Sequence, residues 1–423
     1  MATPNPAQPA GARFALLYRL AQTFNSSLDL DEVLNRVMDE VITATRAERG
    51  FVMLHEADEK LAFRVARGME QETIDDPQFQ ISRSVVDRVA RERQPIHTSD
   101  AQSDDRFSMR QSVRFLGLRS ILCVPLEIKD KLLGVIYVDN RLKVGIFTQA
   151  DLELLTAIAS SAAVAVENAR LYQIAVEKGR MERELQMAHD VQAEMLPRET
   201  PQVPGWEFVA RWQPAREMAG DYYDFIPIDD GGGQLGLVIA DVTDKGMAAA
   251  LFMAVTRSIV RASVGRAPSP ADDIAHANRL ICADSTRGMF VTLFYALLDP
   301  SNGEFTYINA GHNPPLLCRA GQDELTELTL TGLPLGILTD TSYEQHTLRL
   351  DPGDLVVFYT DGVTDATNAQ QQDFGMERLQ RVILEHRHAS AAEVMDALGK
   401  AIHDFIGSTA PFDDIAIMIA RRG

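Results

Sequence analysis

Acidic residues stand where apolar, strand-like runs begin or end in the C-terminal half of this 423-residue chain. Four sets share this position: Asp221, Asp241, Asp361 and the pair Asp413 and Asp414. Carboxylates gathered at neighbouring strand ends would repel one another and raise each other's pKa, unless cations offset their charge. Each aspartate taken alone is a turn residue, above all in Asp361-Gly362, and periodicity does not show that the four sets converge in space.

The chemistry that such a set would support is metal-assisted hydrolysis. Oxygen-only ligands suit Mg²⁺ or Mn²⁺ and not zinc. Two such ions bridged by one carboxylate lower the pKa of a shared water and hold a phosphoryl group for in-line attack. No covalent nucleophile is then required.

Composition limits the partners. Sixty acidic and 41 basic residues give a formal charge of −19, which argues against nucleic acid or an anionic membrane and favours divalent cations. The three cysteines form no CxxC pair, so a reducing compartment is expected. The Pro/Ala-rich start has no signal-peptide pattern, and no run of ~18 uninterrupted apolar residues occurs. We therefore expect a cytoplasmic protein without a membrane or nucleic-acid partner.

The N-terminal part mixes helical and strand patterns. Helical spacing predicts helices around 14–21, 33–41 and 84–91, whereas 51–54, 61–65, 120–128 and 132–139 read as strands, the last two forming a hairpin. A long helical stretch begins at Ala150.

The long helix is predicted to continue into a linker with heptad spacing. Its stripe comprises Leu171, Ile174, Lys178, Met181, Leu185, Ala188, Gln192 and Met195. Such a stripe favours a coiled coil with a partner helix, although Lys178, Gln192 and Gly179 weaken it. A single amphipathic helix lying on its own domain is the alternative. His189 superficially resembles a phospho-accepting histidine, but no ATP-binding motif follows, so we interpret it as a surface or seam residue.

Prolines at 197, 201 and 204 end this helix, and the chain beyond them is strand-rich. The predicted strands are 235–240, 292–298, 305–309, 355–360 and 415–420. The predicted helices are 248–263, 271–285, 376–386 and 391–406.

Six motifs occur in order in this region: Ala219-Gly-Asp-Tyr-Tyr-Asp224, Asp241-Val-Thr-Asp-Lys-Gly246, Asn309-Ala-Gly-His-Asn-Pro-Pro315, Gly332-Leu-Pro-Leu-Gly336, Tyr359-Thr-Asp-Gly-Val-Thr-Asp365 and Asp413-Asp-Ile-Ala416. Together they resemble the sporulation/stress-response branch of the metal-dependent, 2C-type serine/threonine protein phosphatases, over about 197–423. The resemblance implies an α/β sandwich with a two-metal centre between its sheets.

On the family pattern, Asp241 would bridge both ions and the carbonyl of Val242 would bind one of them. Asp361 and Asp413 would complete the ligands of the first ion, and Asp221 would contribute to the second site. Asp414 would be a ligand or a supporting residue; the pattern does not separate it from Asp413. Asp241 and Asp361 would act in catalysis through metal-bound water.

The sequence departs from the family pattern in the second motif, where Asp244 replaces a small residue, and in the first, where Ala219 replaces glycine. His312 invites a role as general acid, but a hydrogen-bonded structural histidine is the favoured interpretation. Lys245 is interpreted as a solvated lysine that could also attract phosphate.

The N-terminal part resembles a GAF sensory domain over 13–172. The resemblance rests on Ile121–Leu126, Leu133–Arg141, Phe147–Leu152 and Ala157–Tyr172. The signature of cyclic-nucleotide-binding members is altered at Arg141 and Leu152, so the ligand is left unknown. A GAF fold that has no ligand and serves only for dimerisation is the alternative.

The predicted organisation is α+β: a disordered 1–12, a GAF domain at 13–172 with an antiparallel sheet and flanking helices, a helical linker at 173–198 and a phosphatase sandwich at 199–423. The predicted function is hydrolysis of phosphoserine or phosphothreonine with two Mn²⁺ or Mg²⁺ ions. The resemblance implies as substrate a phosphorylated STAS-type anti-anti-sigma regulator in a partner-switching pathway, and we expect a homodimer through the GAF domain and linker. The alternatives are a catalytically silent phosphoprotein-binding module and a small-molecule GAF receptor.

Overall fold

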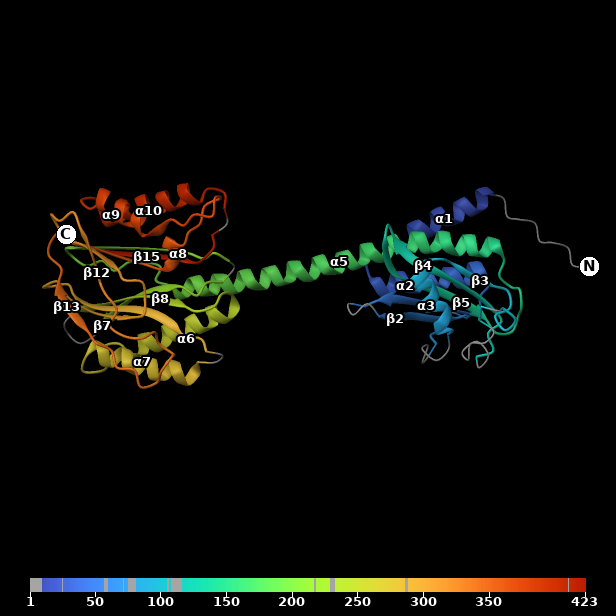
Figure 1. The fold of residues 1–423 in the computed structure, drawn as a ribbon, viewed down its shortest axis with the longest axis horizontal. Coiled ribbons are helices and arrows are strands. Elements are labelled where there is room, and N and C mark those ends of the chain that lie inside the picture. The colour runs from blue at the N-terminus through green and yellow to red at the C-terminus, as the bar shows by residue number, and fades with distance from the viewer. Residues whose placement is uncertain are drawn as a thin grey trace, which may run out of the picture. The chain divides into compact units, whose positions relative to one another are not determined.

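The computed structural model describes residues 10–24, 26–56, 60–70, 72–74, 81–104, 106–107, 116–216, 218–228, 233–285, 288–409 and 411–423. The chain forms two compact units, Met1–Met181 and Glu182–Gly423 (Figure 1). Much of the predicted N-terminal disorder at 1–12 lies outside the described residues, and the first helix begins at Ala10.

The N-terminal unit is built on one antiparallel sheet with strand order β2-β1-β5-β4-β3. Its elements are α1 (Ala10–Phe24), α2 (Leu30–Thr45), β1 (Arg49–His55), β2 (Leu61–Gly68), α3 (Arg83–Glu92), β3 (Ile96–Thr98), β4 (Ser120–Ile128) and β5 (Lys131–Asn140). The predicted β4–β5 hairpin is confirmed, with Lys129 in the left-handed conformation at the turn (φ 52°). One face packs on α2, whose first turn is capped by the Asp29 side chain, and the other face packs on α3.

A single helix, α5 (Gln149–Met195), contributes residues to both units. Its first half packs in the N-terminal core through a buried stripe: Leu155, Ile158, Ala159, Ala162, Val166 and Ala169. By length and composition α5 could cross a membrane, but such burial in a core is what a helix of a folded domain shows. The linker is therefore helical, as predicted.

The C-terminal unit is a sandwich of two antiparallel sheets, with orders β13-β10-β9-β8-β7 and β12-β11-β14-β15-β6. The strands are β6 (Trp206–Gln213), β7 (Tyr222–Ile228), β8 (Gln234–Val242), β9 (Val291–Asp299), β10 (Glu304–Ala310), β11 (Leu316–Cys318), β12 (Leu325–Glu327), β13 (His346–Arg349), β14 (Leu355–Tyr359) and β15 (Ile415–Arg422). Phe294 of the first sheet meets Phe358 of the second edge to face, with ring centroids 5.5 Å apart. The predicted two-sheet sandwich is confirmed.

Helices cover the outer faces of both sheets (Figure 1). They are α6 (Met247–Ser263), α7 (Pro270–Asp284), α8 (Asp361–Thr364), α9 (Gly375–Glu385) and α10 (Ala391–Ile406). α6 and α7 pack on the first sheet, and α9 and α10 pack on the second. All four long helices match their predicted ranges closely, because each carries a clear apolar stripe.

Candidate active site

Two of the predicted site residues lie on adjacent strands of the first sheet. Asp221 directly precedes β7, and Asp241 is the penultimate residue of β8. The strands are antiparallel with Tyr222 opposite Ala240, so the register places Asp221 across from Asp241. The two carboxyl groups are close enough for each to affect the pKa of the other.

The other three predicted acids lie together at one end of the second sheet. β14 ends at Tyr359 and Asp361 begins α8, whereas Asp413 and Asp414 directly precede β15. β14 and β15 are antiparallel neighbours, and the amide of Thr360 donates to the carbonyl of Ala416 at 3.1 Å. Asp361 therefore lies beside the Asp413–Asp414 pair.

Glycines in the motifs allow these loops to approach. A Cβ on Gly220 would lie 2.9 Å from the carbonyl oxygen of Val242, and a Cβ on Gly362 would lie 1.9 Å from that of Asp414. A side chain at either position would push the loops apart, which explains why glycine precedes Asp221 and follows Asp361.

Asp414 joins the two sheets. Its Oδ1 accepts from the amide of Ala215 and its Oδ2 from the amide of Gly220, both at 2.8 Å. Its neighbour Asp413 differs: its Oδ1 accepts from the amide of Asp414, and its Oδ2 lies 2.8 Å from Nζ of Lys245. Both oxygens of Asp414 are thus occupied by main-chain donors of the loop that carries Asp221.

The electrostatics of the gathered acids are unfavourable to ionisation. Burial, together with the charges of Asp361, Asp413 and Asp414, raises the pKa of Asp241 to about 7. Burial and the charge of Asp241 hold the pKa of Asp221 well above its ordinary value, and one of its oxygens, Oδ2, is buried without a hydrogen-bond partner. Burial and the charge of Asp413 raise the pKa of Asp361. The structure therefore brings together all five predicted acids, and Lys245 offsets only part of their charge.

The donor set fits a hard divalent cation by its chemistry. It consists of carboxylate oxygens and the nearby carbonyl of Val242, without a histidine or cysteine. Within the described residues, no three or more His, Cys, Asp or Glu side chains already stand in an arrangement that could hold an ion. Lys245 meanwhile contacts Asp413, donates to the carbonyl of Phe412 and lies over its ring.

His312 lies behind the acids. It is buried, its Nδ1 is 2.9 Å from Oγ1 of Thr292, and its amide donates to Oδ1 of Asn309. Burial lowers the pKa of His312 to about 4, so the ring is neutral at physiological pH. A neutral ring held in this way fits a structural role and not that of a general acid, which needs a pKa near the working pH.

Sequence reasoning missed two groups next to this site. Asp224 is buried against Arg257 and Arg261 of α6, with Nε of Arg257 at 3.1 Å. Gln192, expected on a seam with a partner helix, is buried against the main chain of Ala219. The first could have been suspected from an aspartate inside a strand-like run; no pattern in the sequence points to the second.

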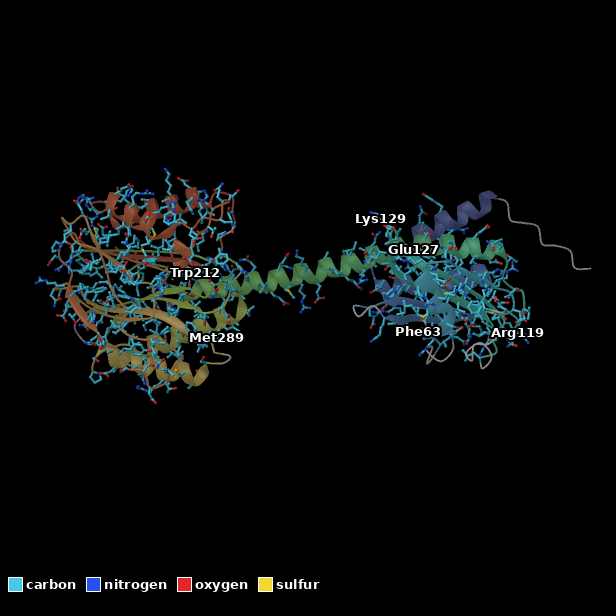
Figure 2. All side chains as sticks on the ribbon, viewed as in Figure 1. Phe63, Arg119, Glu127, Lys129, Trp212 and Met289 are labelled. Carbon is cyan, nitrogen blue, oxygen red and sulfur yellow. The ribbon has the colours of Figure 1, made fainter. Side chains whose placement is uncertain are left out.

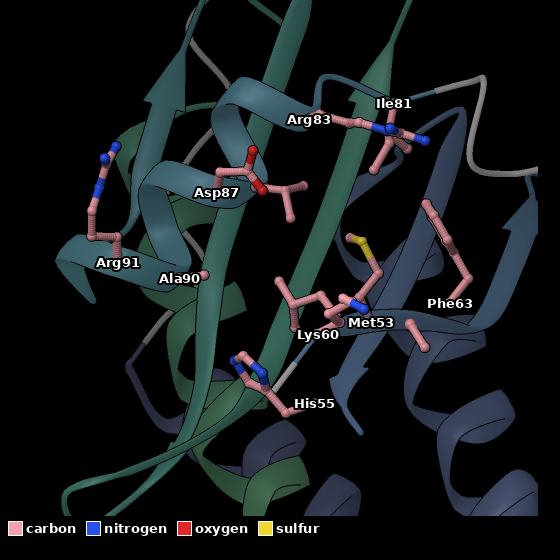
Figure 3. A pocket seen from close by; sticks show the side chains of 12 residues that line it. Met53, His55, Lys60, Phe63, Ile81, Arg83, Asp87, Ala90 and Arg91 are labelled. Atoms are coloured by element: carbon pink, nitrogen blue, oxygen red, sulfur yellow. The ribbon is translucent and has the colours of Figure 1, made fainter. Parts of the chain in front are cut away.

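The N-terminal unit contains a hollow of about 850 Å³ between α3 and strands β1 and β2 (Figure 3). Its polar lining consists of Lys60, Arg83, Arg91 and His55, with one carboxylate, Asp87. Apolar side chains of the sheet and helix form the remainder, including Met53, Phe63 and Ile81. Such a mixture suits a small molecule that carries both an apolar part and negative charge.

Comparison with known proteins agrees with this geometry. The family model "Stage II sporulation protein E (SpoIIE)" matches residues 231–423, and the GAF domain model matches 29–166. Phosphoserine phosphatase RsbU of Bacillus subtilis is 32% identical over 244 residues, covering 56% of this chain and 70% of RsbU. The chain belongs to the SpoIIE family of phosphatases. The predicted resemblances to a GAF domain and to a metal-dependent, 2C-type serine/threonine phosphatase are thereby confirmed.

Two further relatives show how much of this SpoIIE-family chain is matched. Protein IcfG of Synechocystis sp. is 30% identical over 274 residues, covering 58% of this chain but only 43% of IcfG. The SiaA-PP2C domain of Pseudomonas aeruginosa superposes with a TM-score of 0.51 at 19% identity, covering 58% of this chain and 98% of that domain. The latter establishes the fold of the C-terminal unit alone.

Proposed function

We propose that this chain is a signal-regulated protein phosphatase that hydrolyses phosphoserine or phosphothreonine with a metal-activated water. The observation that supports it most is the convergence of Asp221 and Asp241 from one sheet with Asp361 and Asp413 from the other. Buried acids without compensating cations are costly, and a fold retains them where a cation or a reaction uses them.

We assign the ligands as follows. The carboxylates of Asp241, Asp361, Asp413 and Asp221 would hold Mg²⁺ or Mn²⁺, and Val242 would supply its main-chain carbonyl. Asp414 is assigned a supporting role, since both its oxygens accept main-chain hydrogen bonds. Of the pair, Asp413 would be the direct ligand, because its Oδ2 contacts a side-chain cation, Lys245, and not a main-chain donor.

In the mechanism, the bound ions supply a water of lowered pKa and offset the charge of the phosphoryl group. The protein's own residues position the reacting groups. Asp241 and Asp361, from different sheets, fix the position of attack, and Asp414 holds the Asp221 loop against it. Lys245, which contacts Asp413, would provide a cation beside a bound phosphate. His312 stays neutral and supports the β8–β9 pair through Thr292.

The test is Mn²⁺-dependent hydrolysis of p-nitrophenyl phosphate by the full chain, comparing wild type with Asp241→Asn and Asp361→Asn. Exposed Asp351→Asn is the matched control. We expect activity in wild type and control only. Equal Mn²⁺-dependent rates in all four proteins would refute the ligand assignment, whereas no such rate in wild type would favour a phosphoprotein-binding module without catalysis.

For the substrate we propose a phosphorylated STAS-type anti-anti-sigma regulator in a partner-switching pathway. The similarity to RsbU, a phosphoserine phosphatase, supports a protein substrate. A phosphoserine-bearing STAS protein and a phosphoserine peptide of the same local sequence should be compared as substrates. A clear preference for the folded protein is expected; equal turnover of the peptide would contradict recognition of a STAS fold.

For the assembly we propose a cytoplasmic homodimer through the GAF domain and the linker. Supporting this, the middle of α5 exposes apolar side chains: Leu171, Tyr172, Ile174, Val176 and Met181. Sedimentation of the full chain should give a dimer that Ile174→Glu weakens; a monomeric wild type would contradict the proposal. Inserting one residue near Gly179 would rotate the stripe by about 100° and should change the regulated rate.

A second candidate function concerns the N-terminal unit, and the hollow of about 850 Å³ favours it. We propose that it receives a small anionic molecule with an apolar part. Calorimetric titration with cyclic AMP, cyclic GMP and an aromatic carboxylate would test this, with Arg83→Ala as the variant. Binding of one of them that Arg83→Ala weakens supports the receptor; no heat from any of them favours a GAF fold used for dimerisation alone.

A further inference from the structure

The last turns of α5 hold the main chain next to Asp221. The Gln192 side chain is 3% exposed, and its Nε2 donates to the carbonyl of Ala219 at 2.6 Å. The amide of Ala219 donates in return to Oε1 of Gln192 at 3.1 Å. A buried glutamine whose amide group is used in both directions by one residue fixes that residue's position, since losing it would leave two main-chain groups unpaired.

A second contact reaches the other side of the same loop. The ring of His189, one turn earlier in α5, stacks on Trp212 with centroids 5.8 Å apart and planes at 16°. The indole N–H of Trp212 donates to the carbonyl of Asp221 at 2.9 Å. Figure 2 shows Trp212 beside the C-terminal end of α5. The helix thus contacts the loop before Asp221 directly and the carbonyl of Asp221 through one ring.

The loop is held from the active-site side as well. Gly220, between Ala219 and Asp221, donates to Oδ2 of Asp414. Ala219 is therefore held by α5, Gly220 by Asp414 of the second sheet, and the carbonyl of Asp221 by Trp212 of β6. The carboxylate they carry has a buried oxygen without a partner and faces Asp241. A small displacement of Ala219 would move this carboxylate relative to Asp241.

We propose that Gln192 is a positioning residue that sets the Asp221 carboxylate for cation binding, so that cation affinity depends on the docking of the last turns of α5. Gln192 does not touch the reacting atoms. Because a one-residue shift of an α-helix rotates each side chain by about 100°, a change in the rotation of α5 would remove Gln192 from Ala219. The inference rests on the proposed function, since it gives Asp221 a role in holding a cation.

Burial changes along the predicted heptad stripe of α5, to which Gln192 belongs. Leu185 and Ala188 lie on the same face as Gln192 and are half-buried, whereas Leu171, Ile174 and Met181 of the expected seam are exposed. The C-terminal third of the predicted seam therefore contacts the C-terminal unit, through Gln192, and not a partner helix. An apolar side chain at 192 would fill the space but leave the polar groups of Ala219 without partners.

The test is titration of Mn²⁺ into the full chain by calorimetry, for wild type, Gln192→Met, Gln192→Glu and the control Gln186→Ala, which lies exposed on the same helix. Losing a residue that orients a ligand typically weakens metal affinity 10–100-fold. We expect about tenfold weaker binding in Gln192→Met, a smaller loss in Gln192→Glu, which keeps the acceptor for Ala219, and none in the control. The kcat at limiting Mn²⁺ should fall and recover with excess Mn²⁺, with KM for the phosphopeptide unchanged.

The outcomes separate the two claims. If wild type binds Mn²⁺ and Gln192→Met binds it equally well, the positioning role is refuted while the proposed function stands. If wild type itself binds no Mn²⁺, the proposed function is refuted, and so is this inference, which depends on it. A thermal melt in EDTA shows whether Gln192→Met is folded. If it is not, Mn²⁺ binding by Gln192→Glu is compared with that of wild type instead: equal affinity refutes the positioning role, and weaker affinity supports it.

Discussion

Two buried acids, one in each unit, have opposite electrostatic surroundings. Asp139 in β5 is fully buried, and Arg49 satisfies both its oxygens, with Nε to Oδ1 at 2.9 Å and Nη2 to Oδ2 at 2.6 Å. Asp221 in the C-terminal unit is as deeply buried, but it faces Asp241 and has an oxygen without a partner. The balanced acid belongs to the architecture of its sheet, and the unbalanced one marks the place where a cation and a substrate are expected.

The same contrast recurs within one motif. Asp224, three residues after Asp221, is buried against Arg257 and Arg261. Burial alone therefore does not identify a functional acid in this fold. The identifying feature is burial among other acids.

The largest expected effect is on catalysis. Asp241→Asn should lower kcat/KM for a phosphoserine peptide by more than about 100-fold, because even residues that only orient metal ligands cost 10–100-fold in many enzymes. Asp224→Asn, a buried acid of the same motif, should lose stability and retain turnover per folded molecule. Comparable kcat/KM losses in both variants would abolish the distinction between balanced and unbalanced acids.

The next effect is on stability and falls on the N-terminal unit. Asp139→Asn leaves the Arg49 charge buried without its partner, which typically costs about 3–5 kcal/mol. Hydrogen exchange in the full chain should show faster opening of the β5 amides, with β8 unaffected. Asp130→Asn in the exposed β4–β5 turn is the control. Unchanged exchange in β5 would mean that the ion pair contributes nothing to the unit's stability.

A smaller effect concerns pH in the absence of metal. The pKa of Asp241 is raised to about 7 in the folded state, against about 4 when unfolded, so between these values the folded protein binds the additional proton. In EDTA this contribution to stability should be lost as pH rises from about 4 to 7. His312, with its pKa lowered to about 4, contributes in the opposite direction in wild type and variant alike.

The measurement is the difference in melting temperature between wild type and Asp241→Asn across this range. Wild type should lose a few degrees relative to the variant as pH rises, and saturating Mn²⁺ should reverse the trend. A difference that does not vary with pH would show that Asp241 is not desolvated by its neighbours.

The smallest effect is expected at Asp244. This residue has a φ of 71°, a conformation that favours glycine. Asp244→Gly should stabilise the metal-free chain by up to about 1 kcal/mol by relieving that strain and removing a charge near the acids. Gly246→Ala, at φ 82°, should destabilise it. Destabilisation by Asp244→Gly in thermal melting would indicate a structural role for the aspartate.

The sequence predicts much of this structure because its periodic elements are regular. The β4–β5 hairpin, the four long helices of the C-terminal unit and the strands that lead into Asp241 and Asp361 follow from local patterns. β7 was not predicted, since Asp224 and Pro227 interrupt its apolar run, and β11, β12 and β13 are too short to show a period.

Sequence patterns also cannot show contacts between distant segments. The approach of Gly220 to Val242 and of Gly362 to Asp414 depends on how the two sheets pack, and so does the burial of Gln192. Gln192 was expected on a coiled-coil seam because heptad spacing does not reveal which neighbour a stripe meets. Only the assembled sandwich identifies its partner as Ala219.

The most direct test of the central claim is an anomalous difference map at the manganese edge from crystals of the full chain grown with Mn²⁺. The account predicts strong peaks contacted by Asp241 together with Asp361, so that acids of both sheets share the ions. Peaks elsewhere, or an empty map with the acids separated, would contradict it.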